Sequence, residues 1–413
     1  MKNLYSKINK CRICHDNKLV TIGKLGPLTL TGSFLNKSSS KIETTPVDIV
    51  FSKKSSLVQL GHNYNQSKLF GNNYGYRSGL NQTMVKHLKK KSRRLSSILR
   101  LNKNDFILDI GSNDGTFLNS FSKNIKKYGS DPTAKKYKKF YDKNILVVSE
   151  LFPNKKLSKL AKKFKLVTSI AMFYDLSNPS KFIHEVSKIL DPEGIFHVEI
   201  AYLPDIINKN LYDTFCQEHL TYYSYLSFKF LIDQTPFKII DYERNLINGG
   251  SINFNLAFKD SIHKAKAIKL KNLYHQEIKQ KLNSVLTYKK FYNKIQKNAL
   301  ELNLLLRKIK SKKKKIYGFG ASTKGNVILQ MAKINNKFID GIYDVNNFKF
   351  NKFTPGSNII IKNEINIYKD KPDYLLLLIW HFSETINKKL KEFNLKKMKC
   401  ILPFPNLKIF SVK

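Results

Sequence analysis

Short apolar runs alternate with amphipathic stretches between residues 105 and about 200. Five apolar runs predict buried strands, and they occupy residues 105–111, 126–132, 145–152, 165–176 and 194–202. The amphipathic stretches at 112–124 and 179–190 predict helices between strands. Because strands separated by helices form parallel sheets that are covered on both faces, this pattern predicts an α/β domain.

A second alternating unit follows near the C-terminus. Its strands are expected within residues 313–332, 338–345 and 372–380, with a helix after the last. A lysine-rich helical stretch at 260–311 connects the two units, and a further helix is expected at roughly 82–100. Residues 1–60 have the pattern of short strands and turns. We therefore expect an α/β protein with two such units behind a small N-terminal module.

The composition is that of a folded protein. Of 413 residues, 42% are hydrophobic and 12% aromatic, which argues against a disordered or fibrous chain. The longest apolar run, 374–380, is far shorter than the ~20 residues of a membrane helix. The N-terminus lacks the apolar segment of a signal peptide, and four cysteines do not make a disulfide scaffold. We expect a soluble cytoplasmic protein with no membrane partner.

The charge has two interpretations. Lysine and arginine number 74 against 30 acidic residues, a net charge of +44, and such a charge can attract polyanions. A nucleic-acid binder, however, usually concentrates its charge among aromatic or glycine residues. Here lysine is spread over the whole chain, with local runs at 88–94 and 308–315. We favour a compositional bias and expect no nucleic-acid partner, although the charge can still attract a phosphorylated substrate.

The segment LDIGSNDGTFL (108–118) ends a predicted strand with a glycine turn. Gly111 and Gly115 leave room for a ligand against the backbone. Asp109 lies at the strand end, and Asp131 closes the next strand, where its carboxylate can accept hydrogen bonds from a ribose diol. The spacing matches neither the dinucleotide nor the P-loop signature. It suits a nucleoside without a pyrophosphate, such as S-adenosylmethionine (SAM); the alternative is an ordinary strand–turn–helix with a capping aspartate.

Three further features carry weaker signals. The turn YGFGASTKG (317–325) lies between a strand and a helix, so its backbone N–H groups could hold an anion. Glu218 and His219 could form an acid/base pair, because histidine titrates near neutrality. The CxxC of residues 11–14 is half of a zinc knuckle, and no second CxxC exists. Taken alone, each is as readily a plain turn or a structural polar pair.

The order of these motifs is specific when they are taken together. The chain presents CxxC, LDIGSNDG, EHLTYYS, NGGS (248–251), GFGASTKG and a C-terminal KPDYLLLLIW followed by LPFP, with NYGYRSGLNQTM (73–84) and SIAMFYDL (169–176) between them. Over roughly 10–410 it resembles the class I SAM-dependent methyltransferases with a zinc-binding N-terminal domain and a C-terminal C-methyltransferase domain. That family includes the C-methyltransferases that branch nucleotide-linked deoxysugars.

The resemblance implies a fold and a cofactor. A zinc-ribbon-like module is expected at 1–72, a Rossmann-like class I methyltransferase domain at 73–255 and a second Rossmann-like domain at 256–413. SAM is expected in the middle domain. Its implied contacts are Asp109, Gly111, Asn113, Gly115, Asp131 and Ser169.

The resemblance also implies a reaction. A nucleotide-linked 4-ketosugar would lie between the middle and C-terminal domains, where its ketone acidifies the adjacent C–H. His219 matches the base that removes this proton, and the enolate then attacks the sulfonium methyl. Glu218 would hold the sugar. Tyr76, a tyrosine of the pocket wall, is implied as the third catalytic residue, and Tyr74, Gly320 and Lys324 are implied as substrate-binding residues.

Two positions depart from the family. Ser52 and Ser55 stand where the second CxxC falls, and hydroxyls do not replace thiolate ligands, so no bound zinc is expected. Cys216 stands where members of the family have a tyrosine three residues before the histidine. This second departure keeps a non-sugar acceptor open.

Two rival functions remain at this point. One is an O- or N-methyltransferase of another small metabolite, in which His219 would deprotonate a hydroxyl. The other is a basic nucleic-acid-binding protein, which salt-dependent retention on DNA would reveal. The sugar, the methylated carbon and the oligomeric state cannot be read from the residues.

Overall fold

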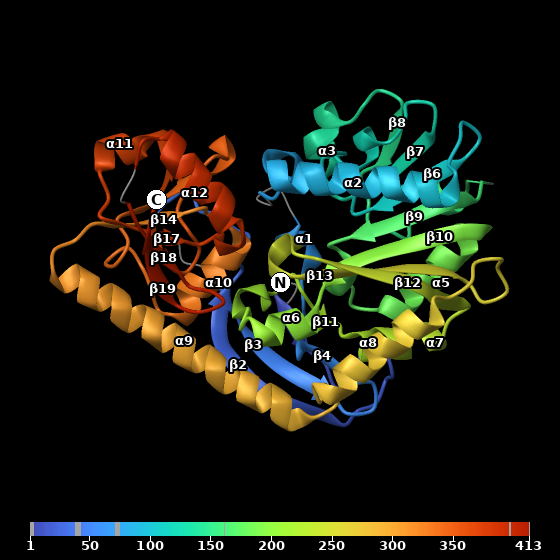
Figure 1. Cartoon of the computed structure of the whole chain (residues 1–413), viewed down its shortest axis with the longest axis horizontal. Helices are drawn as coiled ribbons and strands as arrows, with labels where there is room; N and C mark the ends of the chain where they lie inside the picture. The colour runs from blue at the N-terminus through green and yellow to red at the C-terminus, as the bar shows by residue number, and fades with distance from the viewer. Residues whose placement is uncertain (1–3, 38–42, 71–74, 161, 396–397, 413) are drawn as a thin grey trace.

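The computed structural model describes residues 4–37, 43–70, 75–160, 162–395 and 398–412. Figure 1 shows two lobes, with strands of the N-terminal segment running between them and one long helix along the lower edge. Both lobes are built on sheets with helices against them, so the expected α/β class is confirmed.

The first lobe is built on a seven-stranded sheet of order β12-β13-β10-β9-β6-β7-β8. Its strands are β6 (Phe106–Ile110), β7 (Lys126–Ser130), β8 (Ile145–Val148), β9 (Phe164–Ile170), β10 (Leu190–Ala201), β12 (Phe237–Asn245) and β13 (Ser251–Phe258). Pairing is parallel from β8 to β10, whereas β13 is antiparallel to both of its neighbours. The sequence pattern did not predict this reversal, which follows from the short connection between β12 and β13.

Helices α2 (Gln82–Leu99), α5 (Pro179–Ile189) and α7 (Tyr225–Asp233) pack against this sheet, together with the shorter α3 (Ala134–Tyr137) and α4 (Lys155–Ser158). The short α6 (Leu203–Asn208) instead contributes Leu203 and Ile206 to the core that the N-terminal strands share with the second lobe. Helix α2 begins where the Asn81 side chain accepts hydrogen bonds from the backbone of Thr83 and Met84. Its buried face includes Met84 and Leu88. The helix expected at 82–100 is therefore confirmed.

The helix expected at 112–124 is wrong. After β6 the chain forms turns and one short 3₁₀ segment, Leu118–Ser120. The Asp114 carboxylate accepts hydrogen bonds from the backbone and hydroxyl of Thr116, at 3.2 and 2.6 Å. Such local side-chain bonds compete with helical ones. Helix α2 covers this part of the sheet instead, where Leu88 and Leu95 share a core with Leu118.

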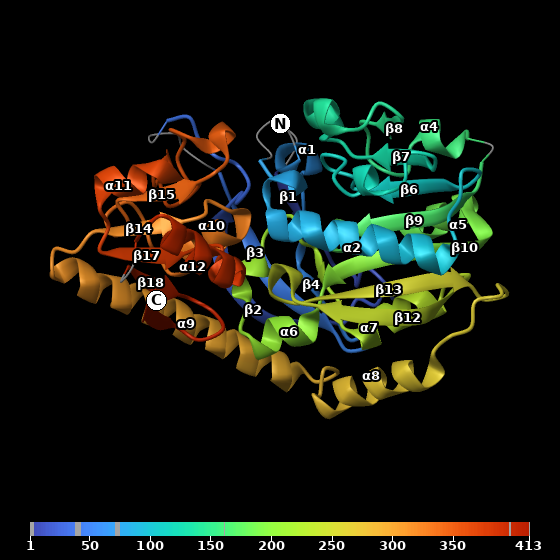
Figure 2. The same ribbon diagram turned by 45° about the horizontal axis from the view of Figure 1, so that its top comes forward.

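The second lobe carries a six-stranded sheet of order β16-β15-β14-β17-β18-β19. Its strands are β14 (Ile316–Phe319), β15 (Gly341–Asp344), β16 (Ile361–Asn363), β17 (Tyr374–Leu377), β18 (Lys399–Leu402) and β19 (Lys408–Ser411); its helices are α10 (Thr323–Met331), α11 (Ile367–Asp370) and α12 (Ser383–Glu392). All pairs are parallel except β18 with β19. Helices α8 (Ala267–Lys279) and α9 (Val285–Ser311) connect the lobes (Figure 2).

The N-terminal strands bridge the lobes. Strands β2 (Leu19–Thr29), β3 (Thr44–Ser52) and β4 (Leu57–Leu60) form an antiparallel sheet, and β1 (Tyr5–Lys7) pairs with β5 (His62–Tyr64). The fourth strand of the larger sheet is β11 (Thr221–Tyr222), which comes directly after the Glu218–His219 segment. Apolar residues of this sheet share one core with α9 and the second lobe.

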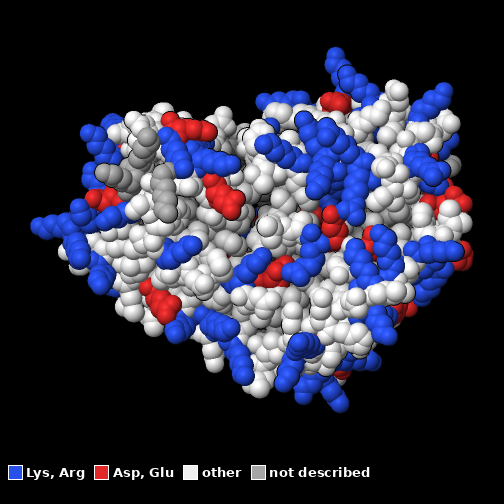
Figure 3. Space-filling model, viewed as in Figure 1, with Lys and Arg blue, Asp and Glu red and all other residues white. Residues whose placement is uncertain are grey.

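Basic side chains cover much of the surface. Figure 3 shows Lys and Arg scattered over the visible face, with a dense group above α2. The described helices include none that is both long and apolar enough to cross a membrane.

Candidate active site

A cavity opens at the carboxyl ends of β6, β7 and β9. The strand order reverses between β6 and β9, which is the switch point at which open α/β sheets bind ligands. The space between its lining residues, open solvent included, is about 1070 Å³. Polar lining residues include Asp109, Ser112, Asn113, Ser130, Asp131, Thr133 and Asp175.

The glycine turn forms one wall of this cavity. Gly111 has φ +85°, and a Cβ atom there would lie 3.1 Å from the side chain of Met172. Both observations favour glycine at this position. Gly115 has φ +77° and packs behind the turn, where a Cβ would lie 2.7 Å from the Tyr141 ring. Gly115 thus shapes the turn from behind the cavity.

Two carboxylates mark the strand ends. Asp131 accepts a hydrogen bond from the Asn113 backbone at 2.9 Å, and its other oxygen accepts from the Thr133 backbone at 2.7 Å. Asp109 accepts from the Thr168 hydroxyl at 2.6 Å, and burial raises the pKa of Asp109 to about 7. The two acidic residues expected around the glycine turn therefore line one cavity.

The other expected residues are distributed as follows. Tyr76 and Asn113 line the cavity, and the Asn113 amide donates to the backbone oxygen of Tyr76 at 3.3 Å. Ser169 is fully buried in β9 and is absent from the described lining of the cavity. Tyr74 lies outside the described residues.

His219 has a defined tautomer. Its Nδ1 lies 2.8 Å from the carbonyl oxygen of Thr214. A carbonyl oxygen only accepts, so Nδ1 carries the hydrogen of the neutral ring and Nε2 keeps its lone pair. Burial lowers the pKa of His219 to about 4, and the nearby charge of Lys324 acts in the same direction. The imidazole is therefore neutral and able to accept a proton at neutral pH.

Glu218 is buried at the junction of all three parts of the chain. Its Oε1 has no hydrogen-bond partner among the described residues. A Cβ atom at Gly32 of the N-terminal segment would lie 2.6 Å from this oxygen and 3.9 Å from the Thr323 hydroxyl of the second lobe. Burial raises the pKa of Glu218 to about 7. The Glu218 carboxylate thus lies where three parts of the chain meet, and its Oε1 is free to accept a hydrogen bond from a ligand.

Asp175 lies between this pair and the cavity, and no motif of the sequence indicated it. It lines the cavity, and its Oδ1 has no partner within the described part of the chain. Its pKa is raised well above the usual range by burial and by the charge of Glu218. Only its position within SIAMFYDL (169–176) could have drawn attention to it.

The second lobe contributes Lys324. Its ammonium group donates a hydrogen bond to the carbonyl of Asn248 at 3.0 Å, so the NGGS turn of the first lobe receives a side chain of the second. Trp380 makes a second contact between the lobes, because its Nε1 donates a hydrogen bond to the buried Asp213 at 2.7 Å. Gly320, with φ +88°, packs against Ile379 at the end of β14. Lys324 is therefore a residue of the second lobe whose charge acts on His219 of the first lobe.

Cys216 lies beside the pair. The ligand atoms of Cys216, Glu218 and His219 lie within 4.8 Å of one another, a spacing at which a metal ion could be held. The charge of Lys324, which lowers the pKa of His219, opposes a second cation at this position. The described lining of the cavity includes none of the three residues, whereas Asp175, whose pKa the charge of Glu218 helps to raise, does line it.

This sheet order, its single reversed strand and the cavity at its switch point define a class I methyltransferase. Family models match in the same order along the chain: "Putative zinc binding domain" at 11–70, "Methyltransferase domain" at 81–242 and "C-methyltransferase C-terminal domain" at 246–405. The chain is a SAM-dependent methyltransferase, and it belongs to the family in which the methyltransferase domain is followed by this C-methyltransferase domain.

One curated relative matches over the full length. C-methyltransferase NovU from Streptomyces niveus is 25% identical over 419 residues, which span 100% of this chain and 99% of NovU. Among solved structures, plantazolicin methyltransferase BpumL in complex with SAH has TM-score 0.34 and 13% identity, covering 42% of this chain and 82% of that one. A SAM-dependent methyltransferase from Clostridium acetobutylicum has TM-score 0.32 and 14% identity, covering 42% and 92%. The family assignment rests on the full-length order of domains.

Proposed function

We propose that this protein transfers a methyl group to a carbon next to the ketone of a nucleotide-linked deoxysugar, with His219 as the general base. The observation that carries the proposal is the fixed tautomer of His219, which leaves a lone pair on Nε2 in the residue that follows the buried Glu218. The similarity to NovU, which is named a C-methyltransferase, supports carbon as the acceptor. We also propose that the working units are 1–72, 73–255 and 256–413.

The cavity fits SAM. Gly111 gives the close backbone approach, Asp131 and Asp109 offer carboxylate oxygens, and Asp175 has an oxygen without a partner among the described residues. We propose that these residues and Asn113 hold the cofactor, whose sulfonium supplies an electrophilic methyl group. Tyr76, from the loop before α2, lines the cavity. It would separate the cofactor from bulk water.

The chain's own residues would perform the proton transfer. His219 Nε2 accepts the proton from the carbon beside the ketone, and the electron pair of that C–H bond moves into the enolate. The Lys324 ammonium, held by Asn248, is placed to stabilise the negative oxygen. Glu218 would accept hydrogen bonds from sugar hydroxyls. After methyl transfer, the imidazolium returns its proton to solvent.

The test is His219→Ala. SAM binding, measured by calorimetry, should be unchanged, because the described lining of the cavity does not include His219. Turnover of a nucleotide-linked ketosugar should fall ~10²–10⁴-fold, the usual contribution of a general base. Without cofactor in deuterated water, native protein should exchange the proton beside the ketone, and the variant should not. An unchanged rate in the variant would contradict the base role.

The departure at Cys216 favours a second candidate, methylation of a hydroxyl or an amine. His219 would then take a proton from oxygen or nitrogen, and no C–H exchange would occur in deuterated water. The exchange measurement therefore separates the two candidates directly. The product's new bond, carbon–carbon or carbon–heteroatom, is the second readout.

A further inference from the structure

The N-terminal segment belongs to a zinc-binding type of domain, yet its donors do not fit zinc. Cys11 Sγ lies 3.3 Å from the Ser55 hydroxyl, and Cys14 Sγ lies 3.5 Å from the Ser52 hydroxyl. The four positions that would surround a metal thus converge, but only two carry sulfur. A structural zinc site needs four thiolate or imidazole ligands. Another interaction must therefore fasten this turn to the sheet.

Arg12, between the two cysteines, makes such a connection. It is only 5% exposed. Its guanidinium donates to the carbonyl of Leu60 at 2.7 Å, the carbonyl of His62 at 2.8 Å and the side chain of Asn63 at 2.8 Å. The backbone N–H of Arg12 donates to the Gln59 side chain at 3.0 Å. All four acceptors belong to residues 59–63, the end of β4 and the start of β5.

We propose that Arg12 replaces the structural zinc of this domain type, fastening the Cys11–Cys14 turn to β4 and β5. The planar guanidinium suits this role, because it holds several donors in one rigid fork. The two thiol–hydroxyl pairs close the remaining side of the turn. Cys11 and Ile13 add apolar packing beside Leu57. The module is metal-free and is fastened by a cation of its own chain.

This fastening extends to the active site. Strand β4 pairs with β11, with Gln59 opposite Thr221. The Leu60 N–H also donates to the carbonyl of Leu220 at 2.9 Å. Arg12 is therefore a positioning residue, which acts on His219 through β4 and the residues that follow the histidine. Only this consequence for catalysis rests on the proposed function.

The first experiment measures metal content and stability. Native protein purified without chelators should contain no stoichiometric zinc. Arg12→Met should lower the thermal midpoint, and Arg12→Lys should restore little, because an ammonium cannot reproduce the fork. Arg307→Met, which removes a largely exposed guanidinium bonded to Asn303, is the matched control and should change the midpoint little. One zinc per native chain, or an unchanged midpoint in Arg12→Met, would overturn the proposal.

The second experiment restores the metal site. Ser52→Cys with Ser55→Cys should bind one zinc per chain, because the four positions already converge. Adding Arg12→Met to that pair should give a protein whose midpoint recovers with zinc and falls with chelator, a rescue that keeps the test valid if Arg12→Met alone does not fold. Failure of the double cysteine variant to bind zinc, or of zinc to rescue the triple variant, would contradict the replacement. Neither readout needs substrate, so this outcome is independent of the proposed reaction.

Discussion

Glu218 and His219 are adjacent in the chain, and burial displaces their pKa values in opposite directions. Burial disfavours the charged form of each group, so the pKa of the carboxyl rises to about 7 and that of the imidazole falls to about 4. At neutral pH the imidazole is almost wholly neutral, whereas the carboxyl is near its midpoint. A base and a titrating hydrogen-bond acceptor therefore lie side by side.

This difference predicts the pH dependence of catalysis. As pH rises through about 7, Glu218 loses its proton and gains capacity to accept hydrogen bonds from sugar hydroxyls. The kcat/KM should therefore increase across this range. Glu218→Gln should lower kcat/KM and remove its rise with pH near 7. His219 is already neutral above a pH of about 4, so its titration does not contribute to that rise. If kcat/KM of Glu218→Gln still rises with pH near 7, the titrating group is not Glu218.

The sequence could predict part of this residue-scale picture. The Glu-His pair, the glycine turn and Asp131 stand in recognisable motifs. Asp175 and the Thr214 carbonyl could not be found in this way, because their roles depend on contacts between segments. The same holds for Gly32, which lies 186 positions before Glu218 in the chain. The missing side chain of Gly32 leaves room for the Glu218 carboxylate.

At the scale of elements, strands were the most predictable feature. Apolar runs predicted β6 to β10 of the first sheet and β14, β15 and β17 of the second, because a buried strand needs apolar residues on both faces. Strands β12, β13, β16, β18 and β19 were not predicted. Strand β11 was also missed, because it has two residues and its pairing with the distant β4 defines it. The wrong helix at 112–124 shows the same effect, since α2 occupies the face that this helix would have covered.

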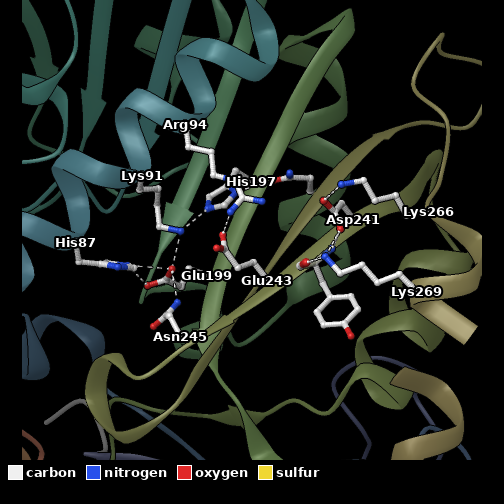
Figure 4. A network of polar contacts seen from close by, with 12 residues as sticks. His87, Lys91, Arg94, His197, Glu199, Asp241, Glu243, Asn245, Lys266 and Lys269 are labelled. Atoms are coloured by element: carbon white, nitrogen blue, oxygen red, sulfur yellow. Dashed lines mark hydrogen bonds and ion pairs between the residues drawn. The ribbon is translucent and has the colours of Figure 1, made fainter. Parts of the chain in front are cut away.

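A polar network fixes α2 against the sheet (Figure 4). Glu199 of β10 accepts from Lys91 at 2.7 Å and from His87 at 2.9 Å, and Asn245 donates to it at 3.1 Å. Burial opposes ionisation of Glu199, but Lys91 and His87 outweigh it and lower the pKa to about 2. Lys91 also contacts His197 at 3.1 Å. Because Met84 and Leu88 of α2 line the cavity, this network sets one of its walls.

Glu199→Met should destabilise the protein by about 3–5 kcal/mol, because it leaves the Lys91 ammonium buried without its carboxylate. Combining it with Lys91→Met should recover much of that loss, since no charge of the pair is then stranded. Arg94→Met removes an exposed ion pair with Glu243 and should cost at most about 1 kcal/mol. Denaturant unfolding measures all three. Additive losses in the double variant would contradict the coupling.

Gly111→Val tests the glycine turn. A branched side chain at φ +85° is strained and would contact Met172 in the cavity wall, so SAM binding measured by calorimetry should be abolished. Gly26→Ala is the control for strain alone, because Gly26 has φ +93° but no described atom within 4 Å of an added Cβ. That control should keep cofactor binding. Native affinity in Gly111→Val would remove the cavity as the cofactor site.

At the scale of the molecule, the site is assembled from three parts. The first lobe supplies the cavity and the Glu218–His219 segment, the second lobe supplies Lys324, and the N-terminal segment holds the intervening backbone. Gln217 shows this third contribution, since its amide donates to the carbonyls of Leu28 and Thr29 at 3.1 and 3.2 Å. The Asn326 amide of α10 in turn donates to the carbonyl of Thr31 at 2.6 Å. Motion of the N-terminal segment or of the second lobe would therefore disturb the Glu218–His219 pair.

Gly32→Ala tests the contribution of the N-terminal segment to the composite site. The added methyl would lie 2.6 Å from Glu218 Oε1, so the carboxylate must move or lose its orientation. We expect a higher KM for the nucleotide-linked substrate and slower turnover. Cofactor affinity should be unchanged, because the described cavity lining includes neither residue. Gly61→Ala is the matched control: its nearest contact would be 3.4 Å, an ordinary packing distance, and its kinetics should remain native. If Gly32→Ala also kept native KM and turnover, the carboxylate of Glu218 would not be the group that holds the substrate at this junction.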